Sequence, residues 1–349
     1  MEHACMTMRN IAIITFLILC KTTLFAQNTT QSDVVMFYNV ENLFDPKNDS
    51  LTQDDDFTPD GAYRWTWQRF AKKRNSIAKT IIAAGAGNAP ILVGLCEVEN
   101  YAVLRQLTDD TPLARIGYGI VHRNSPDMRG IDVALLYRTD HVKILYRYFY
   151  KVTLPSNGHP TRDILYAKAL YDRRDTLHIL VNHWPSKLGG EQQSFPRRMA
   201  AAKRAKSITD SILQASPAAN IVLMGDFNDT PESIPLTEGL QAVLQHGVSS
   251  PDSLYNLMGQ LVRHGEGSLR YRGNWELIDQ FIVSGNLLNP QSAIQCLPDE
   301  VKVFKAPFLL ENDDTYLGLK PFRTYQGPSY KGGVSDHLPI LLPLRRKAE

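Results

Sequence analysis

The chain is poor in cysteine and has no apolar run long enough to cross a bilayer. Four cysteines among 349 residues exclude a small scaffold built on disulfides. Cys5 and Cys20 lie near the N-terminus. Cys96 and Cys296 are either buried thiols or a disulfide pair, which the sequence leaves open. The apolar run at 11–20 is shorter than the roughly 20 residues of a membrane-spanning helix, so we expect no stable membrane span.

Neither sign of charge dominates, and three familiar site signatures are missing. The 38 lysine and arginine residues against 36 aspartate and glutamate residues give a formal net charge of +2, which argues against a polybasic binding protein. The absence of a glycine-rich phosphate loop and of a Gly-x-Ser-x-Gly elbow argues against P-loop nucleotide chemistry and serine hydrolase chemistry. No close cluster of histidine and cysteine occurs along the chain, so zinc is a poor candidate ion.

The first 26 residues have the pattern of a secretory signal peptide. Arg9 precedes the apolar run, and we expect cleavage after Ala26. Lipid attachment at Cys20, as in bacterial lipoproteins, is the less favoured alternative. We therefore predict a secreted or periplasmic protein whose mature part, residues 27–349, is a single domain.

Apolar patterning predicts a layered α/β (α+β) domain. Helical spacing predicts helices over 67–84, 100–107 and 195–213, and a proline-rich helical region over 231–246. Short apolar or alternating runs predict strands. These runs are 33–40, 90–96, 118–122, 131–137, 142–152, 164–171, 176–181, the run that begins at 221, 277–284 and 335–342. The turn-rich residues 285–334 are expected to form a long surface excursion.

Polar side chains stand at the ends of six predicted strands. The run that begins at Ile221 ends in Asp226 and Asn228, which are two residues apart and so point to the same side. Carboxylates hold hard divalent cations, which polarise a phosphoryl group, and amides orient phosphate oxygens. The other ends carry Asn39, Glu97, His183, Asp279 and the pair Asp336-His337. The set predicts metal-assisted phosphoester hydrolysis, with Mg²⁺ expected and Mn²⁺ or Ca²⁺ as alternatives.

Asp279 lies inside an apolar strand and needs a partner, because an isolated carboxylate is costly to bury. His337, near another strand end, is a natural partner. A histidine backed by a carboxylate can accept the proton of an attacking water, because the carboxylate fixes its tautomer and stabilises the imidazolium.

Four segments in order resemble the endonuclease/exonuclease/phosphatase superfamily, which includes pancreatic deoxyribonuclease, sphingomyelinases and inositol-polyphosphate phosphatases. The segments are Tyr38-Asn39-Val40-Glu41-Asn42, Leu95-Cys96-Glu97-Val98, Gly225-Asp226-Phe227-Asn228 and Ser335-Asp336-His337-Leu338-Pro339. The resemblance covers nearly the whole mature chain. It implies a four-layer αββα sandwich of two mixed sheets with the active site at one edge.

The resemblance also implies roles for the strand-end residues. Glu97 would be the main metal ligand, helped by Asn39 and Asp336. Asp226 and Asn228 would position the nucleophilic water and the phosphate. The remaining implied roles are those of His337 as general base, Asp279 as its orienting carboxylate, and His183 as a residue that binds phosphate or protonates the leaving oxygen.

Two further positions match the superfamily more loosely. Asp132 stands roughly where a carboxylate supports the second histidine in deoxyribonuclease-like members, and an ordinary strand-end aspartate is the alternative. Arg129 is a candidate phosphate contact, with an exposed loop arginine as the alternative.

The segments around Arg129, His183 and Arg270 resemble secreted bacterial extracellular nucleases, so the resemblance favours a nuclease acting on DNA or RNA. Lys187, Arg197 and Arg198 are candidates to line a backbone groove, and Asn182 to bind substrate. Trp184 or Tyr271 is a candidate to stack on a base, with core aromatics as the alternative. The alternatives are a phosphatase, a sphingomyelinase-like lipid phosphodiesterase, for which residues 303–310 would supply an apolar hairpin, and a non-catalytic secreted binding protein. We expect a monomer.

Overall fold

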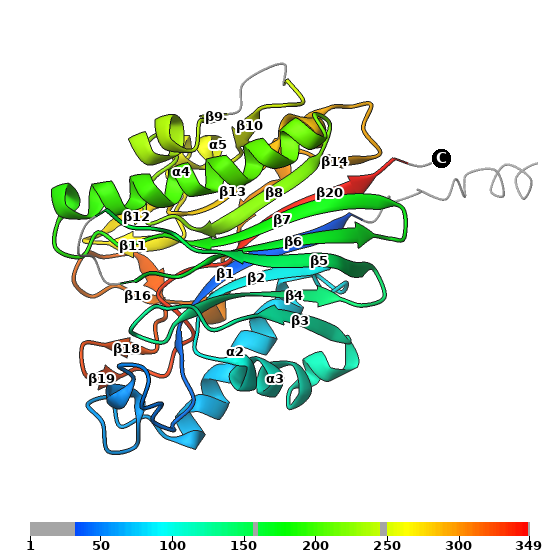
Figure 1. Cartoon of the computed structure of the whole chain (residues 1–349). Helices are drawn as coiled ribbons and strands as arrows, with labels where there is room; N and C mark the ends of the chain where they lie inside the picture. The colour runs from blue at the N-terminus through cyan, green and yellow to red at the C-terminus, as the bar shows by residue number, and fades with distance from the viewer. Residues whose placement is uncertain (1–31, 156–159, 245–249, 348–349) are drawn as a thin grey trace, which may run out of the picture. The chain divides into compact units, whose positions relative to one another are not determined.

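Two β-sheets packed face to face organise the chain, and helices cover their outer faces (Figure 1). The computed structural model describes residues 32–155, 160–244 and 250–347, which belong to the folded unit Ser32–Glu349. The predicted signal peptide lies outside the described residues. The two mixed sheets and their helices confirm the fold class and the four-layer sandwich expected from the sequence.

Each of the two large sheets has seven strands. Sheet A follows the order β14-β20-β1-β2-β4-β3, with β15 beside β20, and sheet B the order β5-β6-β7-β8-β13-β10-β9. The strands of sheet A are β1 Asp33–Leu43, β2 Leu92–Val98, β3 Tyr118–His122, β4 Asp132–Arg138, β14 Ile294–Cys296, β15 Lys302–Val303 and β20 Ile340–Arg346. The strands of sheet B are β5 Val142–Tyr150, β6 Ile164–Tyr171, β7 Asp175–His183, β8 Asn220–Asp226, β9 Ala242–Leu244, β10 Leu254–Asn256 and β13 Asp279–Ser284.

The helices bury one stripe each against these sheets. α2 Trp67–Ala84 and α3 Tyr101–Asp109 cover sheet A, and α4 Glu191–Ala215 covers sheet B (Figure 1). The Thr66 side chain caps α2 by accepting the N–H of Arg69, which satisfies one of the free donors at the helix start. In the described part of the chain, no helix has both the length and the apolar character needed to cross a bilayer.

Small elements complete the chain near the edge of the sheets. They are α5 Gly259–Arg263 and three hairpins, β11 Leu269–Tyr271 with β12 Asn274–Glu276, β16 Leu310–Asn312 with β17 Leu319–Pro321, and β18 Tyr325–Gln326 with β19 Ser329–Tyr330.

Two expectations about local structure are wrong, and one open alternative is resolved. The helix predicted over 231–246 is one turn, Pro235–Gly239, followed by β9, because Pro231 and Pro235 cannot donate helical hydrogen bonds. Residues 285–334 do not only cross the surface, since β14 and β15 pair with β20 inside sheet A. Cys96 and Cys296 are buried free thiols, so the disulfide alternative falls.

His178 makes the stability of sheet B sensitive to acid. Burial and the nearby Lys168 charge lower the pKa of His178 to about 4, and its Nδ1 lies 2.8 Å from the Tyr166 hydroxyl. Because the unfolded chain has the ordinary pKa near 6.5, the stabilising effect is present above that pH and is lost as the pH falls toward 4. We expect the urea midpoint of the natural protein to fall, relative to His178→Gln, between about pH 7 and about pH 4.5. This expectation would be contradicted if the urea midpoints of the natural protein and of His178→Gln changed with pH by the same amount over that range.

Candidate active site

The polar strand ends identified in the sequence meet at one edge of the two sheets. β1 runs parallel to β2, and β7 parallel to β8, so their carboxyl ends lie side by side. His183, at the end of β7, is the register partner of Asp226. Asp279 begins the antiparallel β13 opposite Asp226. We call the group the edge cluster: Asn39, Glu97, His183, Asp226, Asp279 and His337.

One amide joins two carboxylates of the edge cluster. Asn39 Nδ2 donates to Glu97 Oε1 at 3.2 Å and to Asp226 Oδ2 at 3.0 Å. Asn39 Oδ1 accepts the N–H of Glu41 at 3.0 Å, which sets the orientation of the amide. Asn39 therefore turns its nitrogen toward the carboxylates. In this geometry Asn39 positions Glu97 and Asp226, and its predicted role as a metal ligand stays a prediction.

A β-bulge directs Glu97 into the cluster. The pairing of β2 with β4 shifts register between Cys96 and Val98, and bulges commonly re-aim a side chain beside an active site. Glu97 has a φ of +60° and Asn228 a φ of +51°, both in the left-handed region that non-glycine residues seldom adopt. Backbone strain is therefore present at two of the predicted site residues.

Glu97 and Asp226 form a suitable site for a hard divalent cation. Both offer carboxylate oxygens, and these are the ligands that Mg²⁺ and Ca²⁺ prefer. Burial and the nearby Asp279 carboxylate raise the pKa of Asp226 to about 7. A cation held by these carboxylates would relieve this unfavourable crowding of negative charge.

His337 is paired with Asp279 as the sequence predicted. Its Nδ1 lies 2.6 Å from Asp279 Oδ2, and its Nε2 lies 3.9 Å from Asp226 Oδ2. Burial acts to lower the pKa of His337, but the Asp279 carboxylate outweighs it and holds that pKa well above the ordinary value. A divalent cation at Glu97 and Asp226 would oppose this rise by repulsion. The geometry leaves Nε2 as the nitrogen that faces the cluster.

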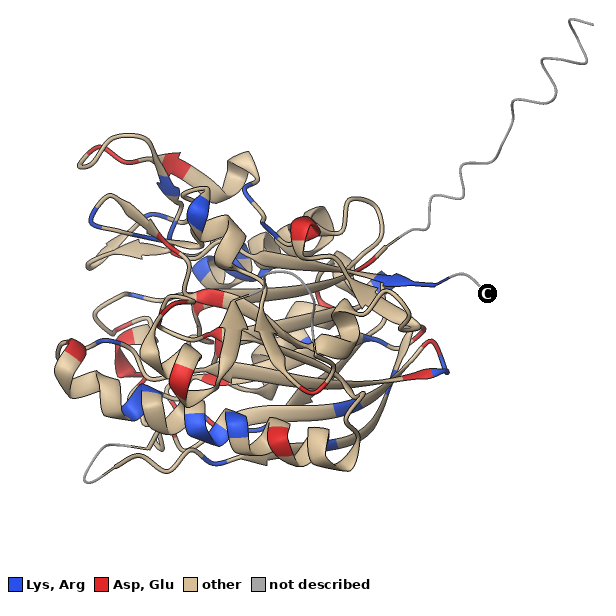
Figure 2. Ribbon diagram, turned by 90° about the horizontal axis from the view of Figure 1, so that it is seen from above, with Lys and Arg blue, Asp and Glu red and all other residues tan. Residues whose placement is uncertain are grey.

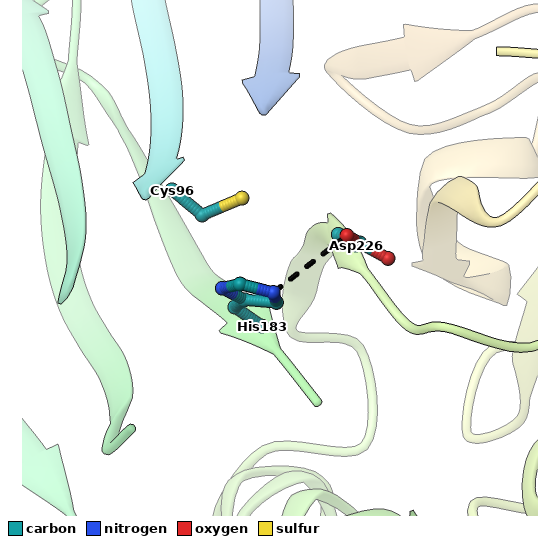
Figure 3. A group of neighbouring side chains, drawn as sticks. All are labelled: Cys96, His183 and Asp226. Carbon is teal, nitrogen blue, oxygen red and sulfur yellow. Dashed lines mark ion pairs between the residues drawn. The ribbon is translucent and has the colours of Figure 1, made fainter. Parts of the chain in front are cut away.

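His183 is buried and uncharged. Burial, with the charges of Arg162 and Arg129, holds its pKa well below the ordinary value. Its Nε2 lies 3.7 Å from Asp226 Oδ2 (Figure 3) and 3.9 Å from Glu97 Oε1. Its Nδ1 has no hydrogen-bond partner among the described residues. A neutral imidazole is a poor acid, so the lowered pKa favours phosphate binding by His183 over protonation of the leaving oxygen.

Cys96 stands beside His183 and Asp226, a grouping that the sequence did not reveal (Figure 3). One ligand atom from each of the three lies within 4.8 Å of the others. Burial and the carboxylates of Asp226 and Glu97 raise the pKa of the Cys96 thiol well above its usual value. Because zinc binds the thiolate, this environment keeps zinc a poor candidate even though a histidine and a cysteine are close together.

Arg162 is a second group that sequence reasoning missed. It is buried, and it donates to the backbone oxygens of His183 at 3.2 Å and Trp184 at 2.6 Å and to Asp127 Oδ2 at 2.9 Å. Asn228 Nδ2 donates to the same Trp184 oxygen at 3.0 Å. Arg162 thus fixes the chain at the end of β7, from which His183 projects.

Asp336 belongs to an ion-pair network that the sequence also did not reveal. Arg323 Nη2 lies 3.0 Å from Asp336 Oδ2 and 3.2 Å from Glu41 Oε1. Burial and the Asp336 carboxylate raise the pKa of Glu41 to about 7, and burial lowers the pKa of Lys73, which donates to the Val334 oxygen at 2.8 Å, to about 8. The network holds Asp336 beside His337, and the predicted metal role of Asp336 stays a prediction.

Two residues predicted to contact substrate lie in the core. Trp184 is 1% exposed and packs edge-on against Phe227. Asn182 is fully buried, and its Oδ1 accepts the Trp184 indole N–H at 3.2 Å. Both predictions of substrate contact are wrong, because the Asn182 and Trp184 side chains hydrogen-bond to each other and Trp184 packs against Phe227 in the core under α4.

Asp132 and Arg198 are also engaged elsewhere. Asp132 lies 3.0 Å from His122 Nε2, so the expectation that it supports His183 is wrong. Arg198 is buried and donates to Asp229 at 2.6 Å, so it cannot line a groove.

Two pockets with accessible basic residues adjoin the edge cluster. A pocket of about 250 Å³ is lined by Arg129, Arg162 and Arg197. It lies near His183, because Arg162 donates to the His183 backbone oxygen. The second, of about 370 Å³, contains Asp336 and is lined by Arg272, Lys320, Arg323, Tyr271 and Tyr316. Lys187, predicted to bind substrate, is 42% exposed and lies 3.3 Å from Asp229. Arg129, Lys187 and Tyr271 therefore remain candidates for substrate contact.

Comparison with known proteins shows which protein family the chain resembles. The profile of the Endonuclease/Exonuclease/phosphatase family matches residues 34–346. No protein of curated function matches the chain.

Similar solved structures share the fold at low sequence identity. The human Nocturnin catalytic domain with bound sulfate has a TM-score of 0.54 at 16% identity, over 91% of this chain and 95% of that one. An endonuclease/exonuclease/phosphatase family protein of Bacteroides thetaiotaomicron has a TM-score of 0.54 at 14% identity, over 90% and 95%. D. rerio TDP2, solved with a single strand DNA product, has a TM-score of 0.53 at 13% identity, over 90% and 99%.

Proposed function

Because the chain belongs to the endonuclease/exonuclease/phosphatase family and is a metal-dependent phosphoester hydrolase, we propose that it is a secreted, Mg²⁺-dependent nuclease acting on DNA or RNA. The observation that supports a polymeric substrate is the presence of basic residues beside both histidines. Arg129 and Arg197 lie on the His183 side, and Arg272 lies on the side of Asp336, where Arg323 is already paired with Asp336 and Glu41. Positive charge on both sides of the scissile bond suits a chain of phosphates better than a single phosphate group.

In the proposed reaction each residue of the edge cluster has one role. Glu97, with Asp226 and Asp336 nearby, would hold the divalent cation, which supplies charge neutralisation at the phosphoryl oxygens when it is bound. His337 Nε2 accepts the proton of the attacking water while Asp279 holds the ring. The neutral His183 donates a hydrogen bond to a phosphate oxygen.

Glu97→Gln tests the ion site with the least change in shape. The substitution removes the negative charge and keeps the length of the side chain, so we expect the half-saturating Mg²⁺ concentration to rise by about tenfold or more. The measurement is cleavage of bis-p-nitrophenyl phosphate across a Mg²⁺ titration, with Glu266→Gln, which lies outside the edge cluster, as the control. An unchanged titration curve for Glu97→Gln would remove Glu97 from the ion site.

The nuclease proposal itself is tested on a panel of substrates. Circular DNA, linear DNA, RNA, sphingomyelin and the small ester are each incubated with Mg²⁺, Mn²⁺ or Ca²⁺, and with chelator. Metal-dependent nicking of circular DNA or cleavage of RNA supports the proposal. Hydrolysis of only the lipid or the small ester would leave the family chemistry in place and overturn the nuclease assignment.

Export and oligomeric state are part of the proposal. Expression of the full chain in a bacterium, followed by mass spectrometry of the exported protein, is expected to show a start at Gln27 and a monomer in native spectra. A lipid-modified Cys20 at the N-terminus would support the lipoprotein alternative instead.

One observation favours a lipid phosphodiesterase as the second candidate. Residues 303–310 do not provide the expected apolar hairpin, because Val303 and Leu309 are buried. The tip between β16 and β17 does expose apolar side chains, with Leu317 at 77% and Tyr316 at 52% exposure. Such a tip can enter a lipid surface, which is why sphingomyelin is included in the substrate panel.

A further inference from the structure

The outer face of sheet B is left uncovered at its β5 edge. α4 packs over the part of this face formed by Leu180, Ile221 and Leu223. β5 is the edge strand, and its Tyr146 and Tyr148 are 54% and 47% exposed. The described residues thus leave a strip of sheet open to solvent beside α4.

Strand register places four tyrosines on one face of this strip, of which Tyr146 and Tyr148 are exposed, Tyr150 is half-buried and Tyr166 is buried at 7% exposure. Tyr146 is paired with Lys168, Tyr148 with Tyr166, and Tyr150 with Ile164. Paired residues on adjacent strands point to the same face of a sheet. The ring centroids are 4.7 Å apart for Tyr148 and Tyr150, and 6.2 Å apart both for Tyr146 and Tyr166 and for Tyr150 and Tyr166. We call Tyr146, Tyr148, Tyr150 and Tyr166 the tyrosine platform.

The tyrosine platform is bordered by unopposed positive charge. The guanidinium carbon of Arg204, on α4, lies 4.9 Å from the Tyr150 ring centroid, and Arg204 Nε has no hydrogen-bond partner among the residues that the structure describes. Neither Arg204 nor Lys168 forms an ion pair within the described part of the chain. Residues 142–155, 164–171 and 195–209 contain no aspartate or glutamate. Figure 2 shows basic residues recurring along α4.

We propose that the tyrosine platform, with Lys168 and Arg204, binds single-stranded nucleic acid outside the active site. Bases would stack on the exposed rings, while Lys168 and Arg204 would contact the phosphates. The platform starts near the edge cluster, because Tyr150 pairs with the first residue of β6, next to the end of β7. It runs from there along β5 for about 13 Å. This placement would hold a strand whose neighbouring segment enters the active site, so the inference rests on the proposed nuclease function.

The chemistry favours a nucleic acid over the other polymers that aromatic surfaces bind. A neutral glycan needs ring faces together with carboxylate or amide hydrogen-bonding groups, and carboxylates are absent from these three segments. A lipid surface would require aliphatic side chains that enter the bilayer beside the rings, whereas the register partners of Tyr146 and Tyr148 are Lys168 and Tyr166. A single strand offers both unpaired bases and phosphates, whereas a duplex keeps its bases stacked inside.

Binding is measured separately from cleavage. The Kd of a fluorescent oligothymidylate is determined by anisotropy with chelator present, so that no cleavage occurs. Tyr146→Ala/Tyr148→Ala is expected to raise the Kd by about tenfold or more, and Tyr146→Phe/Tyr148→Phe to leave it nearly unchanged because the rings remain. Lys168→Gln/Arg204→Gln is expected to make the salt dependence of binding less steep. Tyr101→Ala and Lys302→Gln, at exposed sites on other elements, are the matched controls.

The outcomes separate this inference from the proposed function. If the protein cleaves nucleic acid and all platform variants bind oligothymidylate like the natural protein, the proposed binding role of the platform is contradicted and the proposed nuclease function stands. If the protein binds oligothymidylate through the platform and cleaves only sphingomyelin or the small ester, the function falls and the platform stands. Binding to a duplex of the same length as tightly as to the single strand, or to anionic vesicles alone, overturns the platform. Every platform variant is expected to hydrolyse bis-p-nitrophenyl phosphate at the natural rate, which reports an intact fold.

Discussion

Replacing His337 with alanine is expected to lower kcat by about a thousandfold while KM changes little, because the substitution removes the group that accepts the proton of the attacking water. The structure places His337 well for proton transfer, since Asp279 holds its Nδ1 at 2.6 Å and Nε2 faces Asp226. The expected loss is in the chemical step, and so the bound substrate should be held as before.

Two measurements distinguish lost proton transfer from a damaged fold. Added imidazole should partly restore the activity of His337→Ala, because a free imidazole can enter the space that the side chain leaves and accept the proton. Asp279→Asn should show a smaller loss, since the ring keeps a hydrogen-bond partner and loses only its charge. His264→Ala, at an exposed histidine, is the control. A His337→Ala protein that retains more than about a tenth of the natural kcat would end the general-base assignment.

Replacing Arg162 with leucine is expected to have the largest effect on stability, about 3–5 kcal/mol, because it removes the buried cation beside Asp127 and leaves that carboxylate only the half-exposed Arg129, whose Nε lies 3.5 Å away. Arg162 and Asp127 are 5% and 7% exposed, and their side chains are 2.9 Å apart. The substitution also removes the donors to the backbone oxygens of His183 and Trp184. The measurement is the urea midpoint and slope at neutral pH, with Arg197→Leu, an exposed arginine of the same pocket, as the control.

A double variant tests the physical reason for this cost. Asp127→Asn removes the buried charge, so Arg162→Leu/Asp127→Asn should be more stable than Arg162→Leu alone by about 1–2 kcal/mol. If the two substitutions simply add, the cost comes from lost packing and not from the unpaired carboxylate.

Most of the strand framework could be predicted from the sequence because buried strands are continuous apolar runs. The predicted bounds of β3 and β6 and of α2 agree with the structure. The strand ends were visible because each apolar run stops at a polar side chain, and in these sheets the ends that carry Asn39, Glu97, His183 and Asp226 lie at one edge. The pairing of Asp279 with His337 could be inferred because a carboxylate inside an apolar strand needs a partner.

The errors concern residues whose contacts are decided by the fold and not by the sequence pattern. Trp184 follows His183 directly, and only the fold shows that its ring turns into the core beneath α4. Asp132 matched a superfamily position by spacing, but its partner is His122, across the β3 and β4 pair. Arg162 gave no signal, because the oxygens that it contacts belong to the backbone.

One missed residue did leave a signal. Lys73 falls between Phe70 and Ile77 on the apolar stripe of α2 and is 1% exposed. A lysine on the buried face of a helix must have a partner for its charge, and here the hydrogen bonds go to Thr324 and to the Val334 oxygen. Attention to that position would have indicated the ion-pair network around Glu41.

The left-handed backbone at Glu97 and Asn228 makes stability and catalytic activity favour different residues at these two positions. Glycine adopts such angles without strain, so Glu97→Gly or Asn228→Gly would relax the chain and remove a side chain that the reaction uses. A screen of random variants for heat resistance alone would therefore enrich changes at these two positions, and its most robust members would be catalytically silent. Selection of more heat-stable variants of this protein therefore requires that catalytic activity be measured in every round of selection.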